Sequence, residues 1–425
     1  MADSIPQADQ ITGRVLLPPT SHGLALVQGA ARLAVRFTEP PAALPEPGDV
    51  VAVTGAPVDG AFEAHSLVVL APYQGPRPFP QPGSDWYRLH RNGAQLFRAV
   101  EQRARLLRAL RAWFDARGFI EVDTPALATS PGLEVHLDAV PATPRLGFGA
   151  PPSERWLVTS PEYHMKRLLS AGFDRIYQLG KAFRSGEVGR LHNVEFTLLE
   201  WYRAPGTWDD VVCDTEQLVL SAAQTLGVGP QVPYGGHLVD LTPPWPRLTV
   251  REAIQRFAGF DPWPWTDADS LRARAVRAGI AAEDEPEPAD ILVRTLVERV
   301  EPALPGHAPV VLTHWPACMA SLARRVPGDP EVSERFEVYL GGMELANGFG
   351  ELLDADEQRA RLRADLDARA RRGLPAYPID ERFLGALATG CPPAGGNALG
   401  VDRLLMFLTG ATDVAQVVSF MAPDA

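Results

Sequence analysis

The sequence predicts an α+β protein with two parts: a small OB-like β-barrel, and a larger domain in which helices surround an antiparallel sheet. Residues 11–74 contain five short apolar runs separated by Gly/Pro turns, which is typical of a small barrel. Farther along, extended runs at 176–202 and 335–351 predict hairpins, and helical patterns lie between them. At 425 residues and 46% hydrophobic, the chain is long enough for one large domain and a small one.

The composition argues against several classes of protein. No apolar run approaches the length of a membrane span and no charged-then-apolar leader follows Met1, so we expect a soluble cytoplasmic protein with no membrane partner. Cys213, Cys318 and Cys391 are too widely spaced for a metal knuckle or a disulfide framework. The formal net charge of −12 argues against unspecific binding to nucleic acid, which needs a basic surface.

The predicted domains are a barrel at 1–74, a Pro/Gly-rich linker at 75–85 (QGPRPFPQPGS) and a large domain at 86–425. Residues 1–80 hold four arginines against seven acidic residues, with few aromatics. Proteins that bind single-stranded nucleic acid use cationic grooves and stacking platforms. The pattern therefore favours a stabilising or protein-docking barrel, and tRNA binding stays open as the alternative.

The large domain begins with a predicted helix–strand unit. Apolar residues from Phe97 to Phe114 recur at helical spacing, and Gly118 ends the helix. GFIEVDTPAL (118–127) follows as a predicted strand ended by Pro125. Residues 205–310 are less informative; they predict helices that pack outside the sheet and a solvated acidic loop at 281–290.

SPEYHMKRLL (160–169) is a turn entering a helix, with Pro161 suited to the first helical turn. On the pattern alone, Ser160 and Glu162 are an ordinary N-cap and a first-turn acid favoured by the helix dipole. A resemblance described below implies a different role for both.

The stretch 183–202 (FRSGEVGRLHNVEFTLLEWY) concentrates arginines, a histidine and carboxylates among regularly spaced apolar residues. IYQLGKAF (176–183) and 195–202 predict two strands joined by a loop at 185–193. Arg184 ends one strand and Glu200 lies on the other, so the pair is suited to hold a phosphate and a cationic substrate at once. Arginine fits this task because its planar fork binds phosphate in two places and never deprotonates.

A second group of carboxylates lies at 335–358. Glu337 and Glu344 flank the tight turn at 341–342, which brings both to one end of two antiparallel strands, and paired oxygen ligands suit Mg²⁺ held against phosphates. Glu351 follows in ELANGFGE, and a buried carboxylate is a natural partner for an ammonium. A hairpin with surface acids would not explain acids at 337, 344 and 351 within otherwise apolar strands.

The C-terminal third completes the predicted elements. VVLTHWPACMASLA (310–323) predicts a strand followed by a helix, and 355–372 predicts a charged helix on the solvent side. GGNALGVDRLLMFLTG (395–410) predicts a short strand and then a helix from Asp402. Arg403 lies at the start of that helix, a favourable place for an anion.

The segments FRSGE and HNVEFTLLEWY together resemble motif 2 of the class II lysyl-tRNA synthetases, and most closely their truncated relatives that ligate lysine to elongation factor P. The helix–strand–Pro unit at 97–125 resembles motif 1, which builds the dimer interface, and GGNALGVDRLL resembles motif 3. The resemblance runs from about residue 86 to the C-terminus. It implies the class II antiparallel catalytic sheet, a homodimer, ATP and Mg²⁺.

The resemblance also implies a role for each matched residue. Arg184 and Arg403 would be catalytic, on the α- and γ-phosphates, with Glu337 and Glu344 on Mg²⁺. Further ATP contacts would come from Ser185, Gly186, Glu187, His192, Asn193, Phe196, Glu344, Leu345 and Gly400. The amino-acid substrate would be bound by Ser160, Pro161, Glu162, Glu200, Tyr202, Asn347, Phe349 and Glu351.

The implied function is that of an ATP-dependent ligase that activates a lysine, (R)-β-lysine above all, and transfers it to a lysine of elongation factor P. Ala346, where the synthetases have Gly, favours the ligase, whereas the N-terminal barrel favours a compact lysyl-tRNA synthetase with tRNA as the acceptor. Two departures bear on the site: Gly186 replaces the motif 2 glutamate, with Glu187 beside it, and Gly350 stands where the ligases tend to carry His. A non-catalytic nucleotide or amino-acid sensor is the third reading, supported by Gly186 alone.

Overall fold

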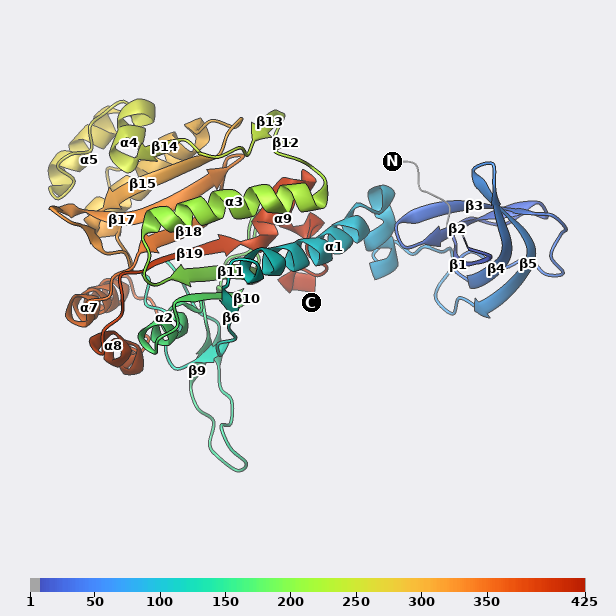
Figure 1. The fold of residues 1–425 in the computed structure, drawn as a ribbon, viewed down its shortest axis with the longest axis horizontal. Helices are drawn as coiled ribbons and strands as arrows, with labels where there is room; N and C mark the ends of the chain where they lie inside the picture. The colour runs from blue at the N-terminus through green and yellow to red at the C-terminus, as the bar shows by residue number, and fades with distance from the viewer. Residues whose placement is uncertain (1–7, 425) are drawn as a thin grey trace. The chain divides into compact units, whose positions relative to one another are not determined.

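The computed structural model describes residues 8–424 and divides into two compact units, 1–101 and 102–425. In the first unit, five strands form a closed barrel in the order β1-β2-β3-β5-β4 (Figure 1). Their bounds are Gln10–Val15, Gly23–Gln28, Ala31–Phe37, Val50–Val58 and Ala61–Ala71 for β1 to β5. Alternate strand residues such as Ile11, Val35 and Phe62 fill the barrel, as the period of 2 requires. Residues 1–7 of the predicted barrel segment and residue 425 lie outside the described residues.

The Pro-rich segment 75–85 packs within the first unit through a series of rings. Tyr73, Phe79, Trp86, His90 and Phe97 contact one another in that order, with ring centroids 4.2–5.2 Å apart. The helix α1 begins inside this series and spans Asp85–Asp115, with non-helical backbone angles at 91–94. A domain boundary at 75–85 therefore stays a prediction, since the first compact unit extends to residue 101.

The second unit is built on one large, mainly antiparallel sheet, which confirms the predicted fold class. The strand order is β14-β15-β17-β18-β19-β11-β10-β6, with β16 paired to β17. The bounds, in that order, are Arg247–Thr249, Val310–Pro316, Asp329–Leu340, Met343–Gly350, Gly395–Gly400, Glu195–Arg203, Arg175–Phe183 and Ile120–Glu121, with Arg325–Val326 for β16. The pairs β14·β15 and β10·β6 are parallel, and the other pairs of the sheet are antiparallel.

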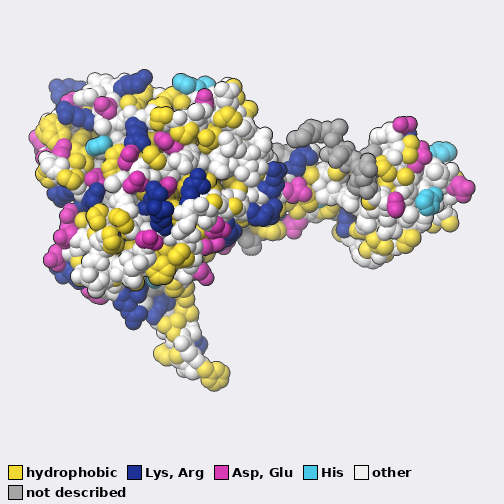
Figure 2. All heavy atoms as spheres, viewed as in Figure 1, with side chains coloured by type: hydrophobic (Ala, Val, Ile, Leu, Met, Phe, Trp, Pro, Cys, Tyr) yellow, Lys and Arg dark blue, Asp and Glu magenta, His cyan; other side chains and the backbone are white. Residues whose placement is uncertain are grey.

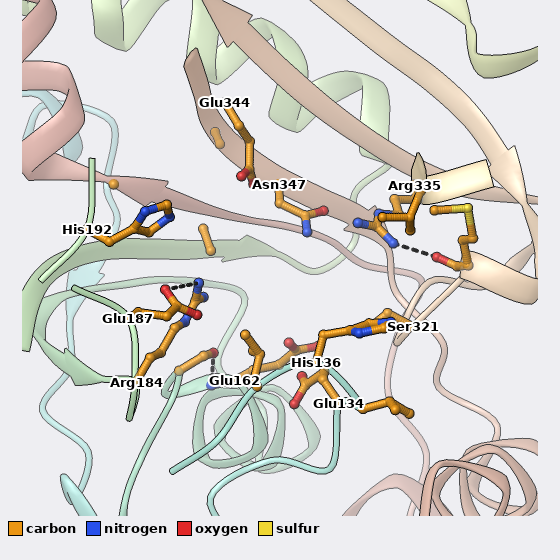
Figure 3. A pocket seen from close by; sticks show the side chains of 18 of the residues that line it. Glu134, His136, Glu162, Arg184, Glu187, His192, Ser321, Arg335, Glu344 and Asn347 are labelled. Atoms are coloured by element: carbon orange, nitrogen blue, oxygen red, sulfur yellow. Dashed lines mark hydrogen bonds and ion pairs between the residues drawn. The ribbon is translucent and has the colours of Figure 1, made fainter. Parts of the chain in front are cut away.

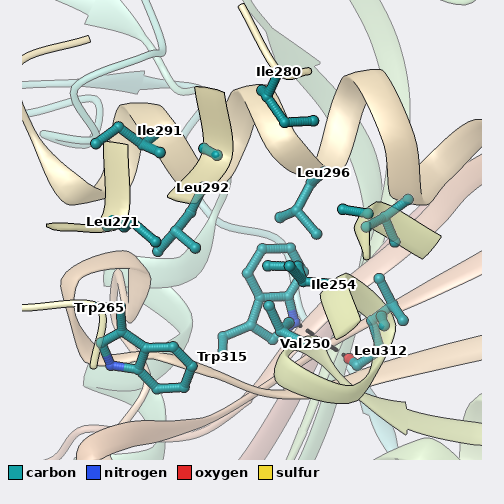
Figure 4. Close-up of a cluster of buried hydrophobic side chains, with 14 of the residues drawn as sticks. Val250, Ile254, Trp265, Leu271, Ile280, Ile291, Leu292, Leu296, Leu312 and Trp315 are labelled. Carbon is teal, nitrogen blue, oxygen red and sulfur yellow. Dashed lines mark hydrogen bonds between the residues drawn. The ribbon is translucent and has the colours of Figure 1, made fainter. Parts of the chain in front are cut away.

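Helices pack against this sheet in three groups. α3 (Trp208–Leu226) crosses one face and is tied to β19 by a hydrogen bond from Asn397 Nδ2 to Thr215 Oγ1 of 2.8 Å (Figure 1). α4 (Val250–Ala258), α5 (Ala268–Arg277) and α6 (Pro288–Thr295) share an apolar core with β15, centred on Trp265 and Trp315 (Figure 4). α2 (Glu162–Ser170), α7 (Ala355–Arg371) and α8 (Glu381–Ala388) form another group, in which Tyr163 stacks on Phe383. α9 (Val401–Thr409) follows β19 directly.

Two smaller sheets complete the elements. The first has the order β7-β9-β8, with bounds Leu127–Ala128, Arg155–Leu157 and Pro141–Ala142, and the second pairs β12 (Gln231–Tyr234) with β13 (His237–Asp240). No helix among residues 8–424 is long and apolar enough to cross a membrane.

Two predicted elements are wrong in extent. The strand predicted at 118–127 pairs with the large sheet at Ile120 and Glu121 alone, and residues 127–128 join the small sheet instead. The helix predicted after β15 is a single 3₁₀ turn at Ala317–Met319. Beyond this turn the backbone pairs with the residues that follow β18. Leu322 O accepts a hydrogen bond from Leu352 N, and Ala323 forms a β-bridge with Glu351. Tertiary pairing thus overrides the helical propensity of this alanine-containing segment.

Candidate active site

One face of the large sheet carries several of the predicted site residues in two rows. Because side chains alternate along a strand, Phe196, Leu198, Glu200 and Tyr202 of β11 share a face. The register pairs Glu200 with Ala398, Ala398 with Asn347, and Asn347 with Glu337, which forms one row across four strands. The next row holds Tyr202, Gly396, Phe349 and Arg335. Residues more than a hundred positions apart are therefore brought together by register.

A cavity of about 530 Å³ opens over this face, bounded also by α2, by the loops around 134–137 and 184–193, and by α6 and α7 (Figure 3). Most of the predicted site residues line it: Ser160, Glu162, Arg184, Glu187, His192, Asn193, Phe196, Glu344, Leu345, Asn347, Phe349, Gly400 and Arg403. The other predicted residues, Pro161, Ser185, Gly186, Glu200, Tyr202, Glu337 and Glu351, do not line it. Glu200, Tyr202, Glu337 and Glu351 are buried beneath the wall.

Glu200 lies at the centre of a buried hydrogen-bond group. Its carboxylate accepts from Ser160 Oγ at 2.9 Å and from Tyr202 Oη at 2.6 Å, and it is 2% exposed. Burial, and then the charge of Glu162, raises the pKa of Glu200 to about 8. Ser160 Oγ also accepts from the backbone N–H of Glu162 at 3.1 Å, so this serine joins the start of α2 to the carboxylate.

Lys166 is the buried cation of this group, and the sequence analysis assigned it no role. Its Nζ atom lies 2.7 Å from Glu162 Oε1 and 2.5 Å from Glu351 Oε2, and the side chain is fully buried. Burial lowers the pKa of Lys166, but the two carboxylates more than offset this effect and raise it. Burial likewise raises the pKa of Glu351 to about 8, against the lowering by Lys166. The i, i+4 spacing of Glu162 and Lys166 in the predicted helix was the sequence feature that could have indicated this ion pair.

Gly396 is required for the close approach of these groups. A Cβ atom at this position would lie 2.4 Å from both Glu351 Oε1 and Tyr202 Cε1. Any larger residue would therefore displace the carboxylate or the phenol. Gly350, the residue that departs from the ligases, has its missing Cβ directed at Glu334 Oε2, so a side chain there would meet Glu334 first.

The opposite end of the cavity is cationic. The guanidinium of Arg184 lies 5.1 Å from the ring centroid of Phe196, and it faces Glu187 at 3.9 Å. Arg403, in the first turn of α9, donates to Glu344 O at 2.6 Å and contacts His192 Nε2 at 2.7 Å. Burial, and then Arg403, lowers the pKa of His192, so the ring is neutral at pH 7 and its Nε2 can accept. Two arginines and a helix N-terminus make this end suited to phosphate.

α9 is held in place by Asp402, a residue that the sequence analysis used only to start the helix. Its carboxylate accepts from Thr197 N of β11 at 2.9 Å and from Arg103 Nη1 of α1 at 2.5 Å. The neighbouring Arg403 is therefore anchored to the central sheet. No pattern in the sequence links positions 103, 197 and 402.

The two predicted metal ligands differ in their surroundings. Glu344 lines the cavity, whereas Glu337 accepts from Arg335 Nη2 at 2.6 Å and from Tyr339 Oη at 2.7 Å. Burial raises the pKa of Glu337 to about 7, opposed by Arg335 and reinforced by Glu344. Among residues 8–424, no group of three or more His, Cys, Asp or Glu is placed to hold a metal. This pair suits an ion that is also bound by substrate phosphates.

The remaining predicted residues shape the loops. Ser185 N donates to Asp138 O at 2.7 Å, and Pro161 precedes the first residue of α2. Asn193 uses both ends of its amide on backbone, donating to Glu195 O and accepting from Ala422 N, each at 2.9 Å. Gly186 has φ of +79°, and no atom lies within 4 Å of its missing Cβ.

The antiparallel sheet with this site on one face is the arrangement expected for a class II synthetase, and comparison with known families gives the same class. Residues 86–423 match the family described as tRNA synthetases class II (D, K and N), and the chain belongs to this family.

Two kinds of relative were found. A lysine–tRNA ligase of Dehalococcoides mccartyi is 36% identical over 321 residues, which are 75% of this chain and 63% of that ligase. The elongation factor P–(R)-β-lysine ligase of Haemophilus influenzae is 38% identical over 324 residues, 76% of this chain and 95% of the relative. That of Erwinia tasmaniensis is 40% identical over 324 residues, 75% of this chain and 93% of the relative. The resemblance identified from the motifs is thereby confirmed.

Proposed function

We propose that this protein is an ATP-dependent ligase that activates a lysine, with (R)-β-lysine preferred, and transfers it to a lysine of elongation factor P. One observation carries the proposal: a single cavity has a cationic end, lined by Arg184 and Arg403, and is also lined by Ser160 and Glu162, which contact the buried Glu200 and Lys166 beneath its wall. A substrate with a reacting carboxylate at one end and an ammonium at the other matches this polarity.

The reaction would proceed in two steps. A carboxylate oxygen of the amino acid attacks the α-phosphorus of ATP, forming the acyl–phosphate bond as the bond to the β-phosphate oxygen breaks and pyrophosphate leaves. The amine of the acceptor lysine then attacks the acyl carbon, forming an amide, releasing AMP and giving up a proton. Neither step needs a protein nucleophile, so catalysis is positioning plus neutralisation of charge.

The residues of the chain divide this work between them. Arg184 would neutralise charge that develops on the α-phosphate, and Arg403, anchored through Asp402, would bind the terminal phosphate. Phe196 offers a ring beside Arg184 for the adenine. Glu200, Tyr202 and Glu351 would bind the distal ammonium, whose charge offsets the cost of ionised buried carboxylates.

The carboxylates of Glu337 and Glu344 fit Mg²⁺, because both are hard oxygen donors and the negative charge of Glu344 raises the pKa of Glu337, which a bound cation would offset. Arg335 now pairs with Glu337 and would give way to the ion. Bound there, the ion would neutralise charge on the phosphates.

Two acceptors for the activated lysine are compatible with the fold, a protein and a tRNA. The ligase relatives are matched along 93–95% of their length, which favours a protein acceptor. Charging of tRNA is the alternative, favoured by the lysine–tRNA ligases among the relatives and by the presence of a barrel. A cytoplasmic homodimer, associated through the segment resembling motif 1, is part of the same proposal.

Pyrophosphate exchange tests the first step. Purified protein with ATP, Mg²⁺ and labelled pyrophosphate should form labelled ATP only when lysine or β-lysine is added. An Arg184→Ala variant is expected to lose exchange by at least about 100-fold, as loss of a charge-stabilising group does elsewhere. Absence of exchange with every lysine isomer, together with retained nucleotide binding, would contradict the proposal and favour a sensor.

A further inference from the structure

A hairpin arm at residues 140–157 is a part of the second unit that the proposed mechanism does not use. Its two strands, β8 and β9, pair through Pro141 and Trp156. Figure 1 shows the arm projecting away from the rest of its unit beside β9. Phe148 lies eight positions beyond Val140, so the arm extends at most about 25 Å from its base.

The end of the arm exposes two large apolar side chains. Phe148 is fully exposed, and Leu146 is 59% exposed. Figure 2 shows hydrophobic side chains at the end of the arm. An aromatic side chain presented in this way is suited to anchor a protein partner, because its burial there removes a large apolar area from water.

The arm is held in one conformation by its own contacts. Arg145 forms a β-bridge with Pro152, and its Nη1 atom donates to Ala150 O at 2.9 Å. At the base, the ring of Trp156 packs edge-on against that of Tyr377, with centroids 5.6 Å apart. The exposed end is therefore preorganised, which reduces the conformational entropy lost when a partner binds.

The residues that flank the arm are bonded to the backbone on both sides of Arg184. Asp138 O accepts from Ser185 N at 2.7 Å, and Val158 O accepts from Phe183 N at 3.0 Å. In the proposed reaction the activated acyl group lies beside Arg184. An acceptor that reaches this group is therefore close to the base of the arm.

The side chains of the arm favour a protein over a nucleic acid. Residues 139–153 contain no acidic residue and one basic residue, Arg145, which is bonded within its own turn. Arg155 also donates within the arm, to Ser153 Oγ at 2.7 Å and to Glu154 O at 2.6 Å. Phosphate contacts need available cationic side chains, whereas an apolar end fits a recess in a folded protein.

We propose that the hairpin arm is the docking element for the acceptor protein, and that Leu146 and Phe148 enter an apolar recess of that protein while its lysine reaches the cavity. The inference rests on the proposed function, because it uses the position of the activated acyl group at Arg184. It assigns part of acceptor recognition to a segment that does not line the cavity.

Calorimetric titration of the full-length protein with elongation factor P tests this inference without requiring turnover. A double variant, Leu146→Ser with Phe148→Ser, removes the apolar end of the arm and changes only exposed side chains. We expect it to weaken the binding of elongation factor P by about 10- to 100-fold, the equivalent of burying one large apolar side chain. Lysine-dependent pyrophosphate exchange should be unchanged, since the first step needs no acceptor.

Leu238→Ser is the matched control, because Leu238 is a large apolar residue of β13 that is 55% exposed and lies outside the arm. It should leave both measurements unchanged. Equal affinity of the unaltered protein and the double variant for elongation factor P, or no binding by either, would overturn the inference.

Two further results would also overturn it. A lower molecular mass of the double variant in light scattering, with unchanged affinity for elongation factor P, would make the arm a contact between two copies of this chain. Loss of tRNA charging alone would make it a tRNA contact. Failure of the proposed function is distinct, because the unaltered protein would then show no lysine-dependent pyrophosphate exchange.

Discussion

The two lysines of the sequence allow one sharp test of the buried charge network. Lys166 is fully buried between Glu162 and Glu351, whereas Lys181 pairs with Glu195 at 2.9 Å and both partners are about half exposed. Removing one partner of a buried ion pair costs about 3–5 kcal/mol, because the remaining charge is left uncompensated. Breaking an exposed pair costs about 0–1 kcal/mol. Lys166→Met should therefore lower the free energy of unfolding by about 3–5 kcal/mol, and Lys181→Met by less than about 1 kcal/mol.

The pH dependence of that loss follows from the same charges. Glu351 already has a pKa of about 8, above its usual 4.5, and Lys166 lowers it. Without the lysine its pKa rises further, so the folded variant holds a proton that the unaltered protein releases above about pH 8. A carboxyl group whose folded pKa exceeds its unfolded pKa loses stabilisation as pH rises. The deficit of Lys166→Met should therefore be larger at pH 9 than at pH 7.

Urea denaturation followed by tryptophan fluorescence at both pH values measures these quantities, with Lys181→Met as the matched control. A Lys166→Met deficit within about 1 kcal/mol of the control at both pH values would refute the reasoning. Lys166 would then be a tolerated buried cation rather than the counterion on which Glu162 and Glu351 depend.

Three further predictions concern the site. Burial raises the pKa values of Glu200 and Glu351 to about 8, so a bound ammonium must displace their protons. The KM for lysine should therefore fall by at least about tenfold from pH 6 to pH 8, with proton release in calorimetry. A KM that is flat over this range would contradict this prediction. Glu344→Gln should raise the Mg²⁺ concentration needed for half-maximal pyrophosphate exchange by at least about tenfold, since a hard anionic ligand is lost. An unchanged Mg²⁺ requirement would show that Glu344 is not a metal ligand. Gly186→Glu should lower the free energy of unfolding by about 1–2 kcal/mol, because φ of +79° is strained for any L side chain. It should not tighten ATP binding. Tighter ATP binding without destabilisation would show that the loop accepts the glutamate expected from the synthetases.

Strand-level features of the fold were predictable from the sequence because they are local. The hairpins at 176–202 and 335–351 carry period-2 patterns and turn glycines, and both form with antiparallel registers. The segment 317–323 was not predictable, because its backbone pairing with Leu352 and Glu351 depends on residues about thirty positions away. Propensity cannot register such a contact.

In the site, too, residues within local motifs could be predicted from the sequence, whereas contacts between distant residues could not. Arg184, Glu200 and Arg403 could be found because each lies in a motif whose spacing is visible in the chain. The hydrogen bond from Arg369 to the backbone oxygen of Glu134 could not be found in this way, since it joins residues more than two hundred positions apart. Asp402 and Arg103 are similar: their ion pair joins α9 to α1 and becomes visible only when the chain is folded.

The central claim is that the activated lysine goes to a protein. Incubation of the purified full chain with ATP, Mg²⁺ and labelled α- or β-lysine, offered either elongation factor P or total tRNA, tests it most directly. The account predicts label on elongation factor P, strongest with β-lysine, and none on tRNA. Label on tRNA with none on the protein would contradict it and make this chain a compact lysyl-tRNA synthetase.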